Sequence, residues 1–161
     1  MSERRTLPLA ALATLGHMAL LGGAWSFQLA GYAPCAMCLW QRWPHMAAIP
    51  LGLLCALGVA PRLTAALAGL AALTTAGIGA FHAGVEQGWW RGPSSCTGGD
   101  AGLGGLSGAD LLSTKIADTV VMCDAIAWQF GLSMAGWNAV LSLGLAALWL
   151  ACTVTRRRPS R

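Results

Sequence analysis

Two cysteines separated by two residues are the most reactive groups in this sequence. Cys35 and Cys38 are close enough to form a small disulfide ring that exchanges readily, and the C-x-x-C spacing tends to lower the pKa of a thiol. Cys38 lies just before an apolar segment, where the dipole of a helix would favour its thiolate. Arg42 follows one helical turn later on the same face, and its fixed charge would add to that effect. We therefore expect a redox-active pair with the thiolate on Cys38.

The other four cysteines fall into two groups. Cys55 and Cys152 lie inside apolar segments, where a free cysteine packs as a small hydrophobic side chain. Cys96 and Cys123 lie in a long stretch that is rich in glycine. Thiol–disulfide exchange needs accessible sulfurs, and the glycines would give this stretch the mobility that exchange requires. A purely structural membrane protein, stapled by two disulfides, is an alternative that fits the same cysteine count.

Metal and haem sites fit the sequence poorly. A structural zinc site usually combines two close pairs of ligands, whereas Cys96 and Cys123 are far apart in the chain and no H-x-x-x-H motif is present. A c-type haem needs a histidine directly after the second cysteine, but Leu39 follows Cys38. A b-type haem would need two of the three histidines, which lie singly in different apolar segments. We therefore expect no metal ligands.

The composition indicates that lipid covers part of the protein. Of its 161 residues, 56% are hydrophobic and 10% are charged, whereas a soluble domain carries about 25% charged residues. A spanning helix needs roughly 20 apolar residues, and the sequence contains four such segments. We predict an all-α membrane protein, a four-transmembrane-helix bundle that forms a single domain over residues 1–161. The expected spans are 7–30, 43–60, 63–84 and 132–154, and the expected outer loops are 31–42 and 85–131.

The charges orient the four expected spans. Seven of the ten lysine and arginine residues lie near the two ends of the chain and at Arg62, between the second and third spans. Cytoplasmic segments of membrane proteins are enriched in these residues, so both termini are expected in the cytoplasm and both outer loops on the opposite side, which in a bacterial-type cell is the periplasm. The basic balance thus reports orientation in the inner membrane and does not indicate nucleic acid. The periplasm is oxidising, so disulfides persist there.

Two segments need a separate interpretation. The first apolar run is longer than the core of a signal peptide, which has about 7 to 15 residues, so we expect it to remain as a span. In the second outer loop, apolar residues roughly follow a helical period over residues 110–121. A short helix there could lie on the membrane surface or pack on the bundle.

Several strings of the sequence resemble a known family. The first is Pro34-Cys35-x-x-Cys38-x-x-Gln41-Arg42-x-Pro44. The others are residues 81–90 (FHAGVEQGWW), 92–97 (GPSSCT), 123–124 (CD) and 130–138 (FGLSMAGWN). They stand in the order found in the disulfide bond formation protein B (DsbB) family, and the resemblance covers about residues 10–150. Four cysteines, one arginine and four spans agree together, which makes the resemblance specific.

The resemblance implies a quinone-dependent protein-thiol oxidase. Members of the family re-oxidise a periplasmic thioredoxin-fold oxidant, DsbA, and pass two electrons to a membrane quinone, here ubiquinone or menaquinone. By position, Cys96 would form the mixed disulfide with a DsbA-like partner, and Cys123 would be its disulfide mate. Cys35 and Cys38 would form the membrane-proximal disulfide, with Cys38 facing the quinone.

Two further residues are implied at the quinone. Arg42 and His82 would lie beside the quinone ring, and an arginine near the membrane boundary is costly enough to suggest such a role. Many family members carry glutamate where this chain has Gln41, so Gln41 is assigned no essential role. Two alternatives remain at this point: a structural four-span protein with inert disulfides, and a related oxidase that serves one dedicated client.

Overall fold

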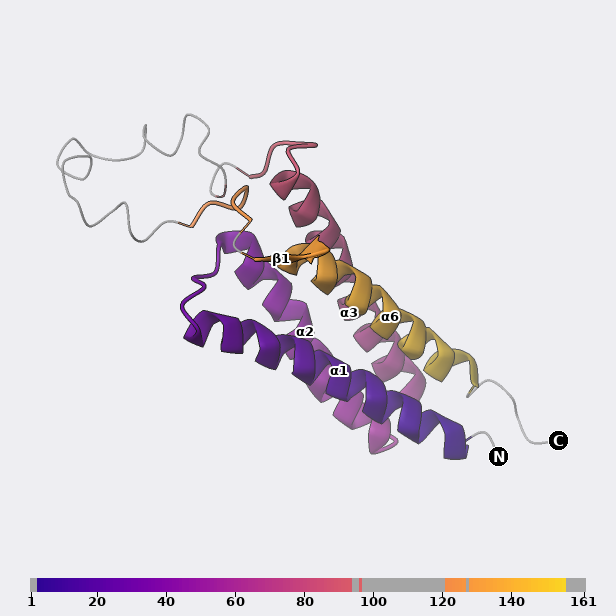
Figure 1. Ribbon diagram of the computed structural model, residues 1–161. Coiled ribbons are helices and arrows are strands. Elements are labelled where there is room, and N and C mark those ends of the chain that lie inside the picture. Colours follow the sequence, from indigo (N-terminus) through magenta and orange to yellow (C-terminus); the bar gives the residue numbers. More distant parts are fainter. Residues whose placement is uncertain (1–2, 94–95, 97–120, 127, 156–161) are drawn as a thin grey trace, which may run out of the picture.

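Four long helices run side by side in the computed structural model, which describes residues 3–93, 96, 121–126 and 128–155 (Figure 1). In chain order the elements are α1 (Glu3–Leu29), α2 (Ala36–Ala56), α3 (Pro61–Glu86), β1 (Gln129–Phe130), β2 (Leu132–Ser133) and α6 (Met134–Thr155). The two short strands pair antiparallel just before α6. The start of α1, the α2–α3 turn and the end of α6 lie at one end of the bundle, so the α1–α2 turn and the α6 start lie at the other.

The helix boundaries follow from local sequence chemistry. The Cys35 sulfur accepts a hydrogen bond from the Cys38 N–H and so caps α2, which then ends at a tight turn. In that turn Ala60 takes a left-handed backbone conformation with φ of 41°, and Pro61 begins α3, where its missing N–H is harmless. This short connection makes α2 and α3 antiparallel neighbours.

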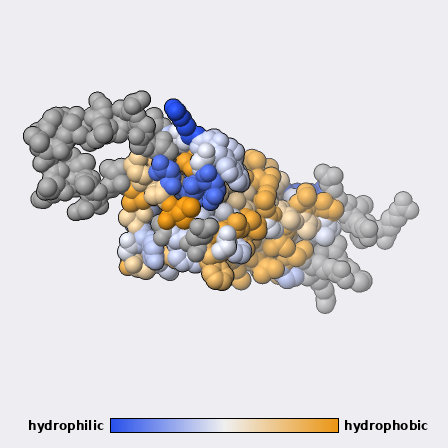
Figure 2. Space-filling model, turned by 45° about the horizontal axis from the view of Figure 1, so that its top comes forward, coloured by the Kyte–Doolittle hydropathy of each residue, from blue (hydrophilic) through white to orange (hydrophobic). Residues whose placement is uncertain are grey.

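The bundle is packed with small residues inside and large apolar residues outside. Its buried core is rich in alanine and also holds Trp149, which is completely buried. The exposed side chains include many leucines, such as Leu15, Leu63 and Leu150. Figure 2 shows hydrophobic residues over the sides of the bundle and hydrophilic residues gathered towards one end. A surface of this kind is suited to lipid.

Three of the four helices are long and apolar enough to cross a membrane. They are α1 from Leu7, α3 and α6, and among the described residues α2 does not meet the same measure. The first half of α2 contains Gln41, Arg42 and His45, which lower its hydropathy. All-helical architecture with long apolar helices is therefore observed as predicted, while a fourth span is not established by hydropathy alone.

The structure differs from the expected loops at two places. Residues 36–42, which were assigned to the first outer loop, form the first two turns of α2, because the cap at Cys35 starts the helix earlier than hydropathy suggests. The expected helix over residues 110–121 lies outside the described residues except for Val121, which has no helical conformation. Because α2 starts earlier than expected, Cys35 and not Cys38 stands at its N-terminus.

Close packing between α3 and α6 depends on Gly79. A Cβ atom at Gly79 would lie 3.0 Å from the Ala135 carbonyl oxygen and 3.1 Å from the Ala139 nitrogen, both of them backbone atoms that cannot move aside easily. Gly79→Ala is therefore expected to lower the free energy of unfolding by about 1–3 kcal/mol. Gly77, on the exposed face of the same helix, has nothing within 4 Å and provides the matched control.

Reversible unfolding in mixed micelles would measure both variants. Gly77→Ala should leave stability unchanged or raise it slightly, because alanine has the better helix propensity. Equal stability of Gly79→Ala and Gly77→Ala would show that the two helices do not approach as closely as the structure indicates.

Candidate functional site

The C-x-x-C cysteines lie at the start of α2 with their sulfurs in contact. Cys35 is the N-cap and Cys38 lies in the first turn, which places the two sulfurs 3.0 Å apart as free thiols. The Cys35 sulfur also accepts from the Cys38 backbone N–H, with a sulfur–nitrogen distance of 3.3 Å. Cys35 is buried and Cys38 is half-buried. The pair is thus held within reach of disulfide formation.

The thiolate of this pair belongs on Cys35. A hydrogen bond from the Cys38 side chain, supported by His82 and by the Cys38 backbone N–H, lowers the pKa of Cys35 from 9.0 to about 4 against the opposing effect of burial. The expectation from sequence placed the thiolate on Cys38. The difference arises because α2 starts directly after Cys35, so Cys35 and not Cys38 stands at the helix N-terminus.

The lowered pKa of Cys35 predicts how the stability of the reduced protein depends on pH. Since its folded pKa of about 4 lies below the ordinary value of 9.0, the reduced folded protein binds fewer protons than the unfolded chain between those values. The stability of the reduced form should therefore rise with pH across this window and be lost as pH falls through about 4. Ultraviolet thiolate absorbance of reduced protein, with Cys35→Ser as the reference, measures the titration. A Cys35-dependent transition near the ordinary thiol value would contradict it.

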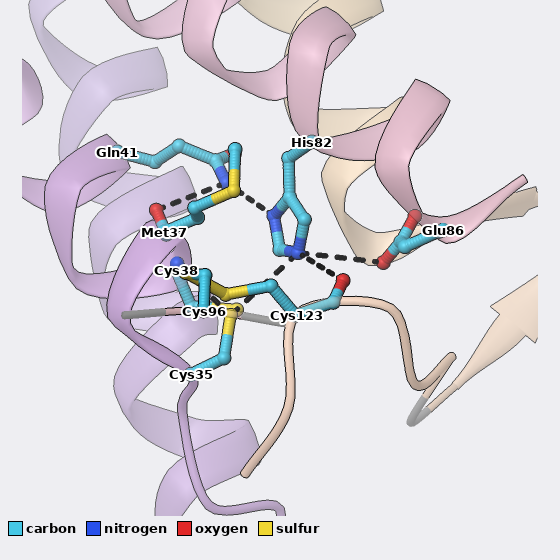
Figure 3. The surroundings of a disulfide bond; sticks show 8 residues. All are labelled: Cys35, Met37, Cys38, Gln41, His82, Glu86, Cys96 and Cys123. Carbon is cyan, nitrogen blue, oxygen red and sulfur yellow. Dashed lines mark hydrogen bonds and ion pairs between the residues drawn. A yellow bond between two sulfur atoms is a disulfide. The ribbon is translucent and has the colours of Figure 1, made fainter. Parts of the chain in front are cut away.

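His82 joins the two pairs of outer cysteines. Its Nε2 lies 3.6 Å from the Cys35 sulfur and 3.2 Å from the Cys123 carbonyl oxygen (Figure 3). Glu86, one helical turn further along α3, places Oε1 3.9 Å from the same nitrogen. His82 is buried, although it lies close to the end of α3. A single imidazole N–H can therefore reach both redox pairs.

Cys96 and Cys123 form a disulfide that packs against the first pair. The structure joins their sulfurs, which is the pairing that the resemblance implies. The Cys96 N–H donates to the Pro93 carbonyl and the Cys123 N–H donates to the Cys96 carbonyl, which fixes the bridge in place. Both cysteines are buried, in one cluster with Cys35. Cys96 was expected to be accessible, but it is buried in this conformation, so exchange at its sulfur would require the cluster to open.

Arg42 links α2 to α1. Its Nη1 donates to the Gln28 side-chain oxygen at 2.6 Å, and its Nη2 donates to the Ala24 carbonyl at 3.3 Å. The remaining Nε–H is buried and has no acceptor among the described residues. A buried donor without a partner is uncommon in proteins, so the surroundings of this guanidinium are unusual.

A cavity of about 400 Å³ brings these residues together. Its wall is mostly apolar and comes from α1, α2, α3, α6 and the segments before α2 and α6. The reactive and polar side chains on the wall are Cys35, Cys38, Gln41, Arg42, His45, His82, Glu86 and Asn138. An apolar pocket of this volume with a few polar groups is typical of a site for a small organic molecule.

Comparison with known protein families agrees with this geometry. The family model described as "Disulfide bond formation protein DsbB" matches residues 4–152, which is nearly the whole chain. The chain belongs to the DsbB family. As a DsbB-family member with long apolar helices it is an integral membrane protein of disulfide bond formation, with thiol oxidoreductase chemistry. No curated protein matches the chain, and no solved structure does.

The structure of this DsbB-family chain also shows site residues that the sequence did not single out. Gln41 is buried and contacts both His82 and Asn138, although it was assigned no essential role. His45 was considered only as a haem ligand, yet it lies on the cavity wall with Asn138. Both Gln41 and Asn138 fall inside the strings that carry the resemblance, which was the available signal.

Three atoms of the DsbB-family site could approach one metal ion. The sulfurs of Cys35 and Cys38 and a ring nitrogen of His82 all lie within 4.8 Å of one another. A closed structural zinc site takes four ligands, and this group has three among the described residues.

Proposed function

We propose that the protein re-oxidises a periplasmic DsbA-like thiol oxidant and passes the electrons to a membrane quinone. The observation that carries this proposal is the cavity. The Cys35–Cys38 thiols, Arg42 and His82 lie on its mostly apolar wall, and the Cys96–Cys123 disulfide packs beside Cys35. A structural role for two stapling disulfides does not need such a cavity or a pair of free thiols at 3.0 Å.

Electrons would pass through two disulfides in order. The dithiol of the reduced partner gives two electrons and two protons to Cys96–Cys123, which opens to two thiols while the partner's disulfide forms. Cys96 and Cys123 then reduce the Cys35–Cys38 disulfide by the same exchange and re-form their own bond. The Cys35–Cys38 dithiol finally gives two electrons and two protons to the quinone, which leaves as quinol.

The Cys35 thiolate favours this direction of flow. A thiolate that is stabilised in the reduced form makes the corresponding disulfide a stronger oxidant, because reduction becomes more favourable. The pKa of Cys35 is lowered to about 4, so the Cys35–Cys38 disulfide would accept electrons from a cysteine pair whose thiolates are less stabilised. The contact between this pair and Cys96–Cys123 in one buried cluster supports transfer over a short distance.

The cavity residues fit a quinone, which supplies a two-electron acceptor with two carbonyl oxygens. The Arg42 guanidinium lines the cavity and offers N–H donors that such an oxygen would accept from, and its charge would stabilise a reduced ring. Apolar side chains such as Phe27 and Leu141 form much of the wall and suit the apolar ring of a quinone. Ubiquinone and menaquinone both supply this acceptor chemistry.

We also propose that α2 is a fourth span of a single membrane domain. With 21 residues it is about 32 Å long at 1.5 Å per residue, enough for a bilayer core of about 30 Å. It is antiparallel to α3 and lies between α1 and α3 in the bundle. The positive-inside rule then places the α2–α3 turn and both termini in the cytoplasm, and the cysteine site at the periplasmic side of the inner membrane.

A reconstituted assay tests the proposed activity. Purified protein is mixed with a reduced DsbA-like protein and a soluble quinone, and loss of partner thiols is followed together with quinol formation. Thiol loss that depends on quinone, with about two thiols oxidised per quinol, is the expected result. Absence of quinone-dependent thiol loss would reject the proposal. Exchanging the DsbA-like protein for other periplasmic thiol proteins distinguishes a general oxidase from one with a dedicated client.

A further inference from the structure

A line of buried ring nitrogens starts in the middle of the bundle at Trp149. The indole Nε1–H of Trp149 donates to Nε2 of His17 at 3.2 Å. Nδ1 of His17 lies 2.7 Å from Nδ1 of His45, which comes from a different helix. All three side chains are at most 3% exposed, so these groups have protein partners in place of water.

The line continues through two side-chain amides to the cysteines. Nε2 of His45 lies 2.9 Å from the Asn138 amide oxygen, and the Asn138 amide nitrogen donates to the Gln41 oxygen at 2.7 Å. The Gln41 nitrogen lies 2.9 Å from Nδ1 of His82 (Figure 3). Nε2 of His82 then reaches the Cys123 carbonyl oxygen. Every member between the two ends makes one bond on each side, and there are branches in the same direction: the Gln41 nitrogen also donates to the Met37 carbonyl, and the Thr75 hydroxyl oxygen accepts from Asn138 and His45.

The two ends of this line fix its direction. An indole nitrogen only donates, and a carbonyl oxygen only accepts. Trp149 therefore requires an unprotonated Nε2 on His17, which puts the His17 proton on Nδ1, facing His45. His45 then accepts at Nδ1 and donates from Nε2. The same logic passes through both amides and leaves Nδ1 of His82 as an acceptor.

We propose that this line of hydrogen bonds is a positioning device that holds the His82 proton on Nε2, facing the Cys35 sulfur and the Cys123 carbonyl. Gln41, Asn138 and His45 are then positioning residues of the redox site. Their value for catalysis rests on the proposed function, in which the same Nε2–H contacts both cysteine pairs during exchange.

The line opposes a second proton on His82. Among the described residues, three titratable side chains face its ring: the Cys35 and Cys38 thiols, from the start of α2, and Glu86, from its own helix. A Cys35 thiolate and the Glu86 carboxylate favour a positively charged His82, which carries a proton on Nδ1 in addition to Nε2. That second proton would point at the Gln41 N–H, so two donors would face each other. Turning the Gln41 amide only moves this clash of donors to Asn138, and so on towards Trp149, whose nitrogen cannot become an acceptor.

Isotope-labelled histidine nitrogens, observed by NMR in the reduced full-length protein near neutral pH, test the proposal. The ring nitrogen shifts distinguish protonated from unprotonated positions, and a His82→Gln variant assigns the signals. The expected result is a proton on Nε2 of His82 and Nε2 of His45, and on Nδ1 of His17. A His82 ring that carries a proton on Nδ1 would overturn the proposal.

Variants separate the line from its local surroundings. Asn138→Leu cuts it and leaves the Gln41 amide held only by the Met37 carbonyl and His82, and Trp149→Phe removes the donor at the far end. Both should raise the fraction of His82 with a proton on Nδ1 by about tenfold, the equivalent of one lost hydrogen bond. Ser142→Ala is the matched control, because the Ser142 hydroxyl contacts Asn138 only as a side branch.

These outcomes test the line of hydrogen bonds and not the oxidase activity. An unchanged His82 signal in both folded variants would show that the line does not set the ring, even if the wild-type protonation is as expected. A change in Ser142→Ala equal to that in Asn138→Leu would also overturn the proposal. Because no quinone or partner enters the experiment, failure here is distinct from failure of the proposed oxidase activity.

Discussion

Replacing Cys38 with serine is expected to stop quinone-dependent thiol oxidation after one exchange. Serine keeps the shape of the side chain but cannot form a disulfide with Cys35, so the Cys35–Cys38 pair can no longer donate two electrons. The Cys96–Cys123 disulfide remains and can still oxidise a reduced partner once. About two partner thiols per chain should therefore disappear in a burst, with no quinol formed and no further turnover.

The burst is measured by mixing the variant with excess reduced DsbA-like protein and quinone. Cys55→Ser is the control, because Cys55 lies on the same helix, contacts the Pro61 carbonyl, and is remote from the cavity. Its serine hydroxyl can keep that hydrogen bond, and full turnover is expected. Continued turnover of Cys38→Ser would show that Cys38 is not part of the electron path.

Replacing Arg42 with methionine should weaken the use of quinone without affecting thiol exchange. Methionine keeps much of the side-chain volume but removes the cation and its N–H donors from the cavity wall. A hydrogen bond from a charged donor contributes about 1.5–3 kcal/mol, so the KM for quinone should rise about 10- to 100-fold. The rate of the single exchange with reduced partner, measured without quinone, should be unchanged.

Two further variants show whether Arg42 acts on the quinone or only on packing. Gln28→Ala removes the acceptor of the Nη1 bond on α1 but keeps the charge, and it should raise the KM much less. Arg42→Lys keeps the charge without Nε and should give an intermediate KM. An unchanged KM in Arg42→Met, or an equal rise in Gln28→Ala, would contradict a direct role at the cavity.

The helices could be predicted because their signals are local. Runs of apolar residues long enough to span a bilayer gave α1, α3 and α6 to within a few residues. The start of α2 could not be found in this way, since Gln41, Arg42 and His45 lower its hydropathy. The helix starts where the Cys35 sulfur caps it. Because this cap puts Cys35 at the N-terminus of α2, the thiolate belongs on Cys35 and not on Cys38.

The site could be predicted only where residues carried chemistry of their own. The four cysteines outside the apolar segments, Arg42 and His82 were named from their types and positions. The structure places four of these six residues on one cavity wall, with Cys96 and Cys123 packed beside Cys35. Gln41 and Asn138 are polar residues without reactivity, and they lie 97 positions apart in the chain. Their contact exists only after α2 and α6 have packed, so no local pattern could indicate it.

Single-turnover reduction of quinone by the protein alone tests the central claim most directly. The chain is reduced, freed of reductant, and mixed anaerobically with quinone in the absence of any partner protein. Quinol is then counted per chain, and disulfides are mapped by mass spectrometry at the earliest time point. The account predicts that the first quinol forms together with a new Cys35–Cys38 disulfide, before Cys96–Cys123 is oxidised. Quinol formation with Cys35 and Cys38 still reduced, or none at all, would contradict it.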